Sequence, residues 1–344
     1  TKMKDPLWVP SKERIRDSLM YEFMQGCSEK FDSYFDLHEW SIRDMESFWS
    51  QFWDFSNIKY SKSYDSVLKN PVMPGAKWFS GSKLNYAENL LKGDPNQVAV
   101  ISLGESGSAK SVTFRELNLK VSSVQKGLIN LGVEKGTIVA GFVPNCVETV
   151  IIMLAVSSLG GIWTSCSPDF GSRGVVDRFG QVNPHILITS NGYSYNGKLF
   201  NLEDKVNGVL NAIDSIQHVV EIEYVDISSN FNHVSVVSFD NLLGNESPNP
   251  SFEQLPFDHP LYIMYSSGTT GPPKSIIHSS GGTLIQHMKE HQLHCDVKPG
   301  KSKMFWFTTC GWMMWNWLVS GLSSGATIVL YDGSPSYPNI DKLW

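Results

Sequence analysis

The chain has 344 residues, enough for one large hydrophobic core or two modest ones. Its apolar fraction of 41% and charged fraction of 18% are ordinary for a globular protein. The net charge of −6 does not favour nucleic acid as a partner, because nucleic acid needs a concentrated basic face. The longest aliphatic run, residues 150–156, is far shorter than the ~20 residues of a membrane span, so we expect no spanning helix.

The five cysteines lie far apart in the sequence, and none belongs to a CxxC pair. They are Cys27, Cys146, Cys166, Cys295 and Cys310. An odd number of scattered cysteines is typical of reduced thiols in a reducing compartment. We therefore expect a cytosolic protein.

Residues 1–92 are predicted to form a helical, aromatic-rich cap. Ser41 and Asp44 have the spacing of a capping box. The apolar residues that follow them then share one helical face, which predicts core packing. These residues are Ile42, Met45, Trp49, Phe52 and Trp53. A loop rich in proline and glycine follows between residues 71 and 81.

From residue 98 onward, predicted strands alternate with predicted helices. Thr113 and Glu116 are predicted to cap a helix that ends at Gly132, and a second helix is expected over 150–159. Strands are predicted at 98–103, 138–143, 162–165, 185–189, 218–224, 261–265 and 327–331. This alternation predicts the α/β class, with a mainly parallel sheet that carries helices on both faces.

The strand at 261–265 leads into a glycine- and hydroxyl-rich loop. The loop consists of Ser266, Ser267, Gly268, Thr269, Thr270, Gly271, Pro272, Pro273 and Lys274. Glycines allow a close backbone approach to phosphate, consecutive N–H groups form an anion nest, and a lysine adds a point charge. The composition therefore suits a polyphosphate.

Two other interpretations of this loop are open. A Walker loop needs glycine directly before the lysine and a helix after it. Here Pro272 and Pro273 have no N–H to donate, and Ile276 and Ile277 favour a strand. A purely structural turn is the second alternative, but it leaves the concentration of hydroxyls, glycines and a lysine unexplained.

A cluster of possible metal ligands follows at His287, His291, His294 and Cys295. Glu290 directly precedes His291, so the HExxH zinc motif is not matched. We interpret the cluster as a solvated helix face and expect no resident metal site.

The loop at 266–274 resembles the signature loop of the adenylate-forming superfamily, which includes acyl-CoA synthetases, luciferases and adenylation domains of peptide synthetases. The segments at 112–117 and 159–163 resemble other motifs of that superfamily, in the same order. The stretches at 40–55 and 78–86 resemble the N-terminal cap of acetyl-CoA-synthetase-like enzymes. The resemblance implies the large layered domain of adenylate-forming enzymes over 93–344, behind a cap at 1–92.

Three further segments, 165–171, 278–287 and 311–317, resemble the acetoacetyl-CoA synthetases within that superfamily. The resemblance implies that the loop residues hold ATP phosphates, with Thr269 and Lys274 at the reacting groups. It also implies that residues after Gly311 line the acyl pocket, which places Trp312, Met313, Met314 and Trp315 there. Methionine is apolar and adaptable, which suits a short acyl chain.

The implied activity is an ATP-dependent, AMP-forming acetoacetate–CoA ligase in ketone body use and lipid synthesis. It would use ATP with Mg²⁺, coenzyme A and acetoacetate. Alternatives are an acetyl- or propionyl-CoA synthetase-like ligase and, in another class, a non-catalytic nucleotide-binding protein of the same fold.

Several parts that this family needs have no match in the chain. These are an acidic residue that helps to hold magnesium, an aspartate for the ribose, and a lysine on a mobile C-terminal lid domain. Thr1 and Trp344, the latter in an expected helix start, look like fragment boundaries. We therefore expect an incomplete AMP-binding domain without the lid, inactive by itself.

Overall fold

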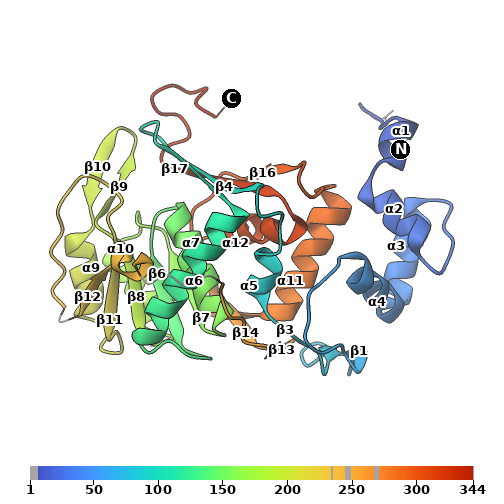
Figure 1. Ribbon diagram of the computed structural model, residues 1–344, viewed down its shortest axis with the longest axis horizontal. Helices are drawn as coiled ribbons and strands as arrows, with labels where there is room; N and C mark the ends of the chain where they lie inside the picture. The colour runs from blue at the N-terminus through green and yellow to red at the C-terminus, as the bar shows by residue number, and fades with distance from the viewer. Residues whose placement is uncertain (1–6, 234, 245–248, 267–270, 344) are drawn as a thin grey trace.

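The computed structural model describes residues 7–233, 235–244, 249–266 and 271–343 (Figure 1). Its main element is a seven-stranded sheet in the order β12-β11-β8-β6-β7-β14-β15. All neighbouring strands in it are parallel except β14 and β15, which are antiparallel. The strands are β6 (Ile138–Phe142), β7 (Ile162–Cys166), β8 (Ile186–Ser190), β11 (His218–Ile222), β12 (Val236–Ser238), β14 (Pro260–Ser266) and β15 (Lys274–Ser279).

Helices cover both faces of this sheet, as the sequence predicted. Successive residues of a strand point to opposite faces, and here they join two separate apolar clusters. Val139 packs with α6 (Phe114–Asn130) and α7 (Val147–Ser158). Ala140 packs with α8 (Ser172–Phe179) and α9 (Glu203–Leu210) on the other side. The central strands are therefore buried on both faces, which explains their continuous apolar sequence.

A second sheet has four strands in the order β16-β17-β4-β5. These are β4 (Val98–Gly104), β5 (Ala109–Thr113), β16 (Lys303–Phe305) and β17 (Thr327–Asp332). The sequence predicted strands at 98–103 and 327–331 but did not show that they pair with each other, as β4 and β17 do. Helix α7 packs between the two sheets, touching β4 and β7. It is therefore buried all round, with Glu148 as its one residue that is not buried.

The remaining elements are shorter. They are α1 (Lys12–Arg16), α2 (Leu19–Gly26), α3 (Tyr34–Arg43), α4 (Met45–Phe55), β1 (Ser66–Lys69), β2 (Lys77–Ser80), β3 (Lys83–Leu84), α5 (Tyr86–Leu90), β9 (Gly192–Tyr195), β10 (Lys198–Asn201), α10 (Phe239–Leu243), β13 (Leu255–Pro256), α11 (Ser280–Lys289), η1 (Glu290–His294), α12 (Met313–Ser320) and η2 (Gly321–Ser324). Residues 341–343, expected to open a helix, form a turn. No helix within the described ranges is long and apolar enough to cross a bilayer. All five cysteines are free thiols, as predicted.

The expected capping box at Ser41 and Asp44 is wrong. The box of this region is formed by Ser33 and Asp36 at the start of α3, and Asp44 caps α4 by itself. The chain leaves the helical conformation at Asp44, so two helices replace the single expected one. Ile42 and Met45, on either side of the break, are consequently exposed to 63% and 40%. The second predicted box, Thr113 with Glu116, is confirmed.

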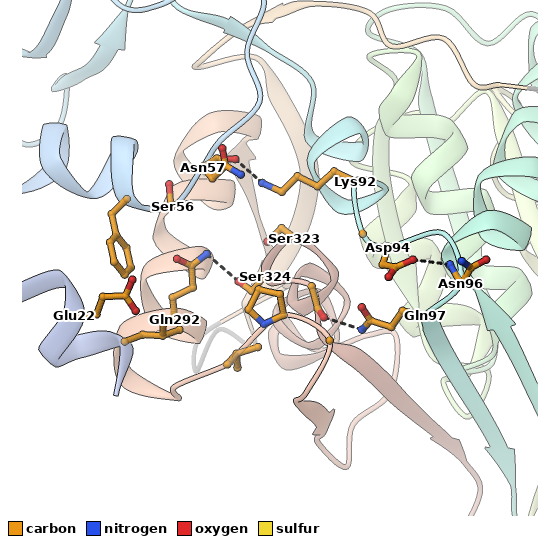
Figure 2. Close-up of a pocket in the computed structure, with 17 residues that line it drawn as sticks. Glu22, Ser56, Asn57, Lys92, Asp94, Asn96, Gln97, Gln292, Ser323 and Ser324 are labelled. Carbon is orange, nitrogen blue, oxygen red and sulfur yellow. Dashed lines mark hydrogen bonds between the residues drawn. The ribbon is translucent and has the colours of Figure 1, made fainter. Parts of the chain in front are cut away.

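Helices α1 to α4 lie at one end of the molecule, beside α11, whereas α5 lies among the elements of the body (Figure 1). Aromatic rings join the cap to the body: Trp53 stacks on Phe79 at 4.7 Å, and Phe79 lies 5.0 Å from Phe257. Gly281 makes room for Phe257, because a Cβ there would lie 2.2 Å from the ring. Elsewhere along the junction, residues 55–57, 92–94, 96 and 97 line one cavity (Figure 2).

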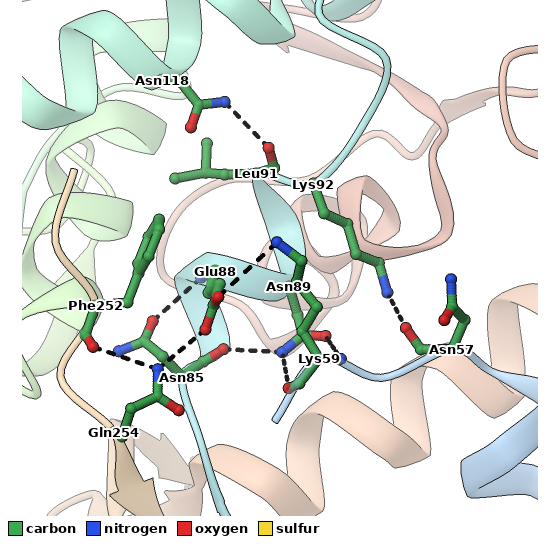
Figure 3. Close-up of polar contacts among 10 residues, drawn as sticks. All are labelled: Asn57, Lys59, Asn85, Glu88, Asn89, Leu91, Lys92, Asn118, Phe252 and Gln254. Carbon is green, nitrogen blue, oxygen red and sulfur yellow. Dashed lines mark hydrogen bonds and ion pairs between the residues drawn. The ribbon is translucent and has the colours of Figure 1, made fainter. Parts of the chain in front are cut away.

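Asn85 fixes the short helix α5 to the body (Figure 3). Its Oδ1 accepts from the backbone N–H of Glu88 at 3.1 Å and so caps the helix. Its Nδ2 lies 3.2 Å from Ser157 O, 3.1 Å from Ser158 O and 2.9 Å from Glu253 O. One fully buried amide therefore satisfies the carbonyls at the end of α7 and those of the segment before β13.

We expect Asn85→Ala to lower the free energy of unfolding by about 2 kcal/mol or more, because it leaves buried carbonyls without donors. Asn130→Ala is the matched control, since Asn130 is exposed near the end of α6. Urea unfolding of both variants gives the comparison. Equal stabilities would show that Asn85 does not hold the junction.

Candidate functional site

The predicted phosphate loop connects the antiparallel strands β14 and β15, and Ser266 pairs with Lys274 across its base. Ser267, Gly268, Thr269 and Thr270 lie outside the described residues. Gly271 has a φ of 140°, a conformation that glycine adopts readily. The carbonyl of Pro273 accepts a hydrogen bond from Gln181 Nε2 at 2.8 Å, which fixes the loop exit beside the end of α8.

The element after the loop is strand β15, as Ile276 and Ile277 predicted. A Walker loop opens a helix at this point, so that interpretation is excluded. Lys274 is the first residue of the strand and is exposed, which leaves its ammonium accessible to a ligand.

The four expected acyl-pocket residues begin helix α12. Trp312 is its N-cap residue and is 59% exposed, and Met313 is 46% exposed. Met314 is half-buried. Trp315 is fully buried, and its Nε1 donates to Asn145 Oδ1 at 2.9 Å. The first three side chains are therefore accessible, whereas Trp315 packs in the core behind them.

Two segments with the acetoacetyl-CoA synthetase resemblance meet at Gly311. A Cβ on Gly311 would lie 3.3 Å from the backbone nitrogen of Ser167 and 3.5 Å from the ring of Phe170. Beside it, Ser165 Oγ donates to Cys310 O at 2.6 Å. The sequence placed residues 165–171 and 311–317 far apart, and the fold brings them into contact.

A small cavity of about 10 Å³, roughly the space of one water molecule, lies next to this contact. Its lining comes from β7, β14 and the start of the α12 region: Trp163, Ser165, Tyr262, Ile263, Met264, Tyr265, Cys310, Gly311 and Asn316. Tyr265 and Asn316 line this cavity, and the sequence reasoning did not single them out. Tyr265 is the residue before Ser266, so a polar group at the end of the strand was the available signal.

Asn145, after strand β6, connects the two sheets through four hydrogen bonds. Its Nδ2 donates to Thr308 O at 3.3 Å and to Tyr331 O at 3.2 Å. Its backbone N–H donates to Asp332 Oδ1 at 3.0 Å, and its Oδ1 accepts from Trp315. A single residue therefore links α12 to both sheets.

Asp332 is buried beside Asn145, and burial raises the pKa of its carboxyl group to about 6. Hydrogen bonds from Asn145 and Tyr224 oppose this shift, while the charges of Glu105 and Asp169 add to it. Glu105 accepts from the backbone N–H groups of Gly197 and Ser334, at 2.9 and 2.8 Å. The carboxyl ends of the neighbouring strands β4 and β17 thus hold two acidic side chains, Glu105 bonded to backbone N–H groups and Asp332 with a raised pKa.

The expected solvated face is correct for His294 and Cys295, which are exposed, but wrong for the other two histidines. His287 and His291 are buried, with His287 Nδ1 2.8 Å from Ser320 Oγ and His291 Nε2 3.0 Å from Trp317 O. Burial lowers the pKa of His287 to about 4 and that of His291 to about 3, so both rings are neutral. His287 belongs to α11, which contacts α12, and His291 belongs to η1, which contacts η2. The described part of the chain contains no group of three side chains that could hold a metal ion.

A family profile described as AMP-binding enzyme matches residues 88–344. The chain belongs to this family. A second profile, described as acetyl-coenzyme A synthetase N-terminus, matches residues 34–90. The family assignment agrees with the layered α/β fold and with the hairpin loop between β14 and β15.

Individual relatives are similar over almost the whole chain. An acetoacetyl-coenzyme A synthetase from Rhizobium meliloti (strain 1021) is 43% identical over 98% of this chain and 53% of the relative. A malonamoyl-CoA synthetase from Penicillium aethiopicum is 41% identical over 96% of this chain and 48% of the relative. The solved structure of an acetoacetyl-CoA synthetase from Streptomyces lividans superposes with a TM-score of 0.95 at 40% identity, covering 99% of this chain and 53% of that one. The chain spans about half the length of the curated relatives it matches.

Asp332→Asn should remove a pH dependence of stability. The carboxyl has a folded-state pKa of about 6 against an ordinary value of 3.8, so the folded protein retains a proton that the unfolded chain releases. The stability of the unmodified protein should fall, relative to the variant, as pH rises from about 4 to 7, by up to about 3 kcal/mol. Urea unfolding of both proteins across this range measures it. A pH-independent difference would contradict the shifted pKa.

Proposed function

We propose that the protein, at the full length of its relatives, is an ATP-dependent, AMP-forming acetoacetate–CoA ligase. The observation that carries this proposal is the similarity to the Streptomyces lividans synthetase, which extends over 99% of the chain. In the proposed reaction, a carboxylate oxygen of acetoacetate attacks the α-phosphate of ATP, which enters as its magnesium complex. Pyrophosphate leaves, and the thiol of coenzyme A then displaces AMP from the acyl-adenylate.

The phosphate-binding role is proposed for the loop between β14 and β15. Ser266, Gly271 and Lys274 flank it in the described structure, and Lys274 has an exposed ammonium. The remaining proposed residues are Ser267, Gly268, Thr269 and Thr270. A charge aimed at a transferring phosphoryl group lowers the barrier by electrostatic stabilisation, which is the role we assign to Lys274. Thr269 is proposed to act beside it.

The acyl-binding role is proposed for Trp312, Met313 and Met314, which are accessible at the start of α12. Trp315 would support them from the core through its bond to Asn145. We also propose that residues 1–92 are a cap, that residues 93–344 are part of the AMP-binding domain, and that the protein acts in the cytosol in ketone body use and lipid synthesis.

A ligase for a different short acid is the second candidate, favoured by the similarity to the Penicillium malonamoyl-CoA synthetase. A substrate panel of acetoacetate, acetate, propionate and malonamate separates the two. A non-catalytic nucleotide-binding protein would turn over none of these acids.

Lys274→Ala should slow acetoacetate-driven pyrophosphate exchange about tenfold to a hundredfold in the full-length protein. The reason is the loss of a charged hydrogen bond, worth ~1.5–3 kcal/mol, at about 1.4 kcal/mol per tenfold. Lys126→Ala is the control, because Lys126 is an exposed lysine of α6. An unchanged rate for Lys274→Ala would remove this residue from the site.

Met313→Ala and Met314→Ala should admit longer acids. Each buried methylene is worth ~0.8 kcal/mol, so the preference should shift several-fold per added carbon. The ratio of kcat/KM for acetoacetate and for a longer 3-keto acid measures the shift, with Met45→Ala as control. If neither variant changes this ratio, these side chains do not form the floor of the pocket.

A further inference from the structure

A cavity of about 830 Å³ lies between the cap and the body (Figure 2). On the body side, its lining includes Gln97, Gly300 and Gly325, which come shortly before strands β4, β16 and β17. These three strands are parallel, so the cavity lies at the amino edge of the four-stranded sheet. The proposed acyl-binding residues follow β16 and therefore lie toward the opposite edge. The cavity is a separate place in the fold.

Lys92 supplies a cation to this cavity. Its Nζ donates to Asn57 O at 2.7 Å, the backbone carbonyl after helix α4 (Figure 3). An ammonium has three donors, and this bond uses one of them. No ion pair joins Lys92 to a carboxylate within the described residues. Asp94, two residues on, instead accepts from the backbone N–H of Asn96 at 2.9 Å.

The surroundings of Lys92 disfavour the charged form of its side chain. Burial lowers the pKa of its ammonium to about 8, and the charge of Lys59 adds to the effect. Lys59 is itself 3.8 Å from Glu88. A partly desolvated cation without a counter-ion is a place where a bound anion gains more than it would in water.

The other walls restrict what that anion can be. Leu19, Phe55, Val297 and Pro299 present apolar surface from both sides of the junction. Glu22 and Asp94 also line the cavity, and their carboxylates would repel a doubly charged group such as a phosphate monoester about twice as strongly as a singly charged one. One cation, an apolar wall and two carboxylates together favour a ligand with one negative charge and a hydrocarbon body.

We propose that this cavity binds an amphipathic monocarboxylate, with its carboxylate on Lys92 Nζ and its hydrocarbon chain against Phe55, Val297 and Pro299. Its volume falls in the range of ordinary small-molecule sites, about 300–1,000 Å³. The ligand would contact cap and body together, so its binding stabilises their junction. The site is independent of the proposed ligase reaction and adds a second class of small acid to what the protein recognises.

Octanoate is the probe, titrated into the 344-residue chain by calorimetry, and octanol is the matched ligand without a charge. We expect octanoate to bind at least about tenfold more tightly than octanol, the lower end for a hydrogen bond to a charged group. Lys92→Met keeps the aliphatic stem and removes the charge, so it should reduce octanoate binding to the octanol level. Lys126→Met should have no effect.

Hydrogen exchange locates the bound octanoate. Protection should appear at residues 93–97 and 297–300, whereas protection confined to 307–314 would place octanoate in the acyl pocket and overturn the proposal. Equal binding of octanoate and octanol would overturn it too, as would undiminished octanoate binding by a folded Lys92→Met. If that variant does not fold, Lys92→Gln, which can still donate to Asn57 O, replaces it. The test measures binding and hydrogen exchange and not ligase activity, so a protein without ligase activity can still confirm or overturn it.

Discussion

The hydrogen bonds of Asn145 hold the two sheets and helix α12 together. The loop after β6 belongs to the seven-stranded sheet, whereas Tyr331 and Asp332 belong to the four-stranded one. A side-chain amide can donate and accept hydrogen bonds at the same time. Here the Nδ2 of Asn145 donates to backbone carbonyls, and its Oδ1 accepts from Trp315. An aspartate would place an acceptor against two carbonyls, and an alanine would leave them unpaired. The position of α12, and with it the proposed acyl site, depends on this residue.

Burial, more than charge pairing, determines the ionisation of groups near the site. Burial raises the pKa of Asp332 and lowers the pKa of His287, and both changes favour the neutral form of the side chain. Burial also raises the pKa of the Cys146 and Cys310 thiols, which disfavours the reactive thiolate. The buried histidines and thiols between the sheets are therefore neutral, and their hydrogen bonds connect secondary-structure elements without the cost of burying ions.

Local signals in the sequence predicted most of the large domain. The Thr113 and Glu116 box and the apolar strands were correct because their spacing is decided within a few residues. The separate second sheet could not be predicted, since the pairing of β4 with β17 joins residues more than 200 positions apart. The burial of His287, and of Trp315 behind the site, likewise depends on contacts made only in the fold. The Ser41 and Asp44 error had a local cause, because Ser33 and Asp36 form a competing box upstream.

The unequal exposure of the two tryptophans at the start of α12 has an optical consequence. The indole of Trp315 is sealed in the core and hydrogen-bonded, whereas that of Trp312 meets solvent three residues earlier. Their emission should differ in wavelength, with Trp315 at the blue side and Trp312 at the red side and open to collisional quenchers. The chain thus carries, at the helix proposed for acyl recognition, an intrinsic fluorophore, Trp312, whose emission spectrum changes when a ligand or another segment covers it.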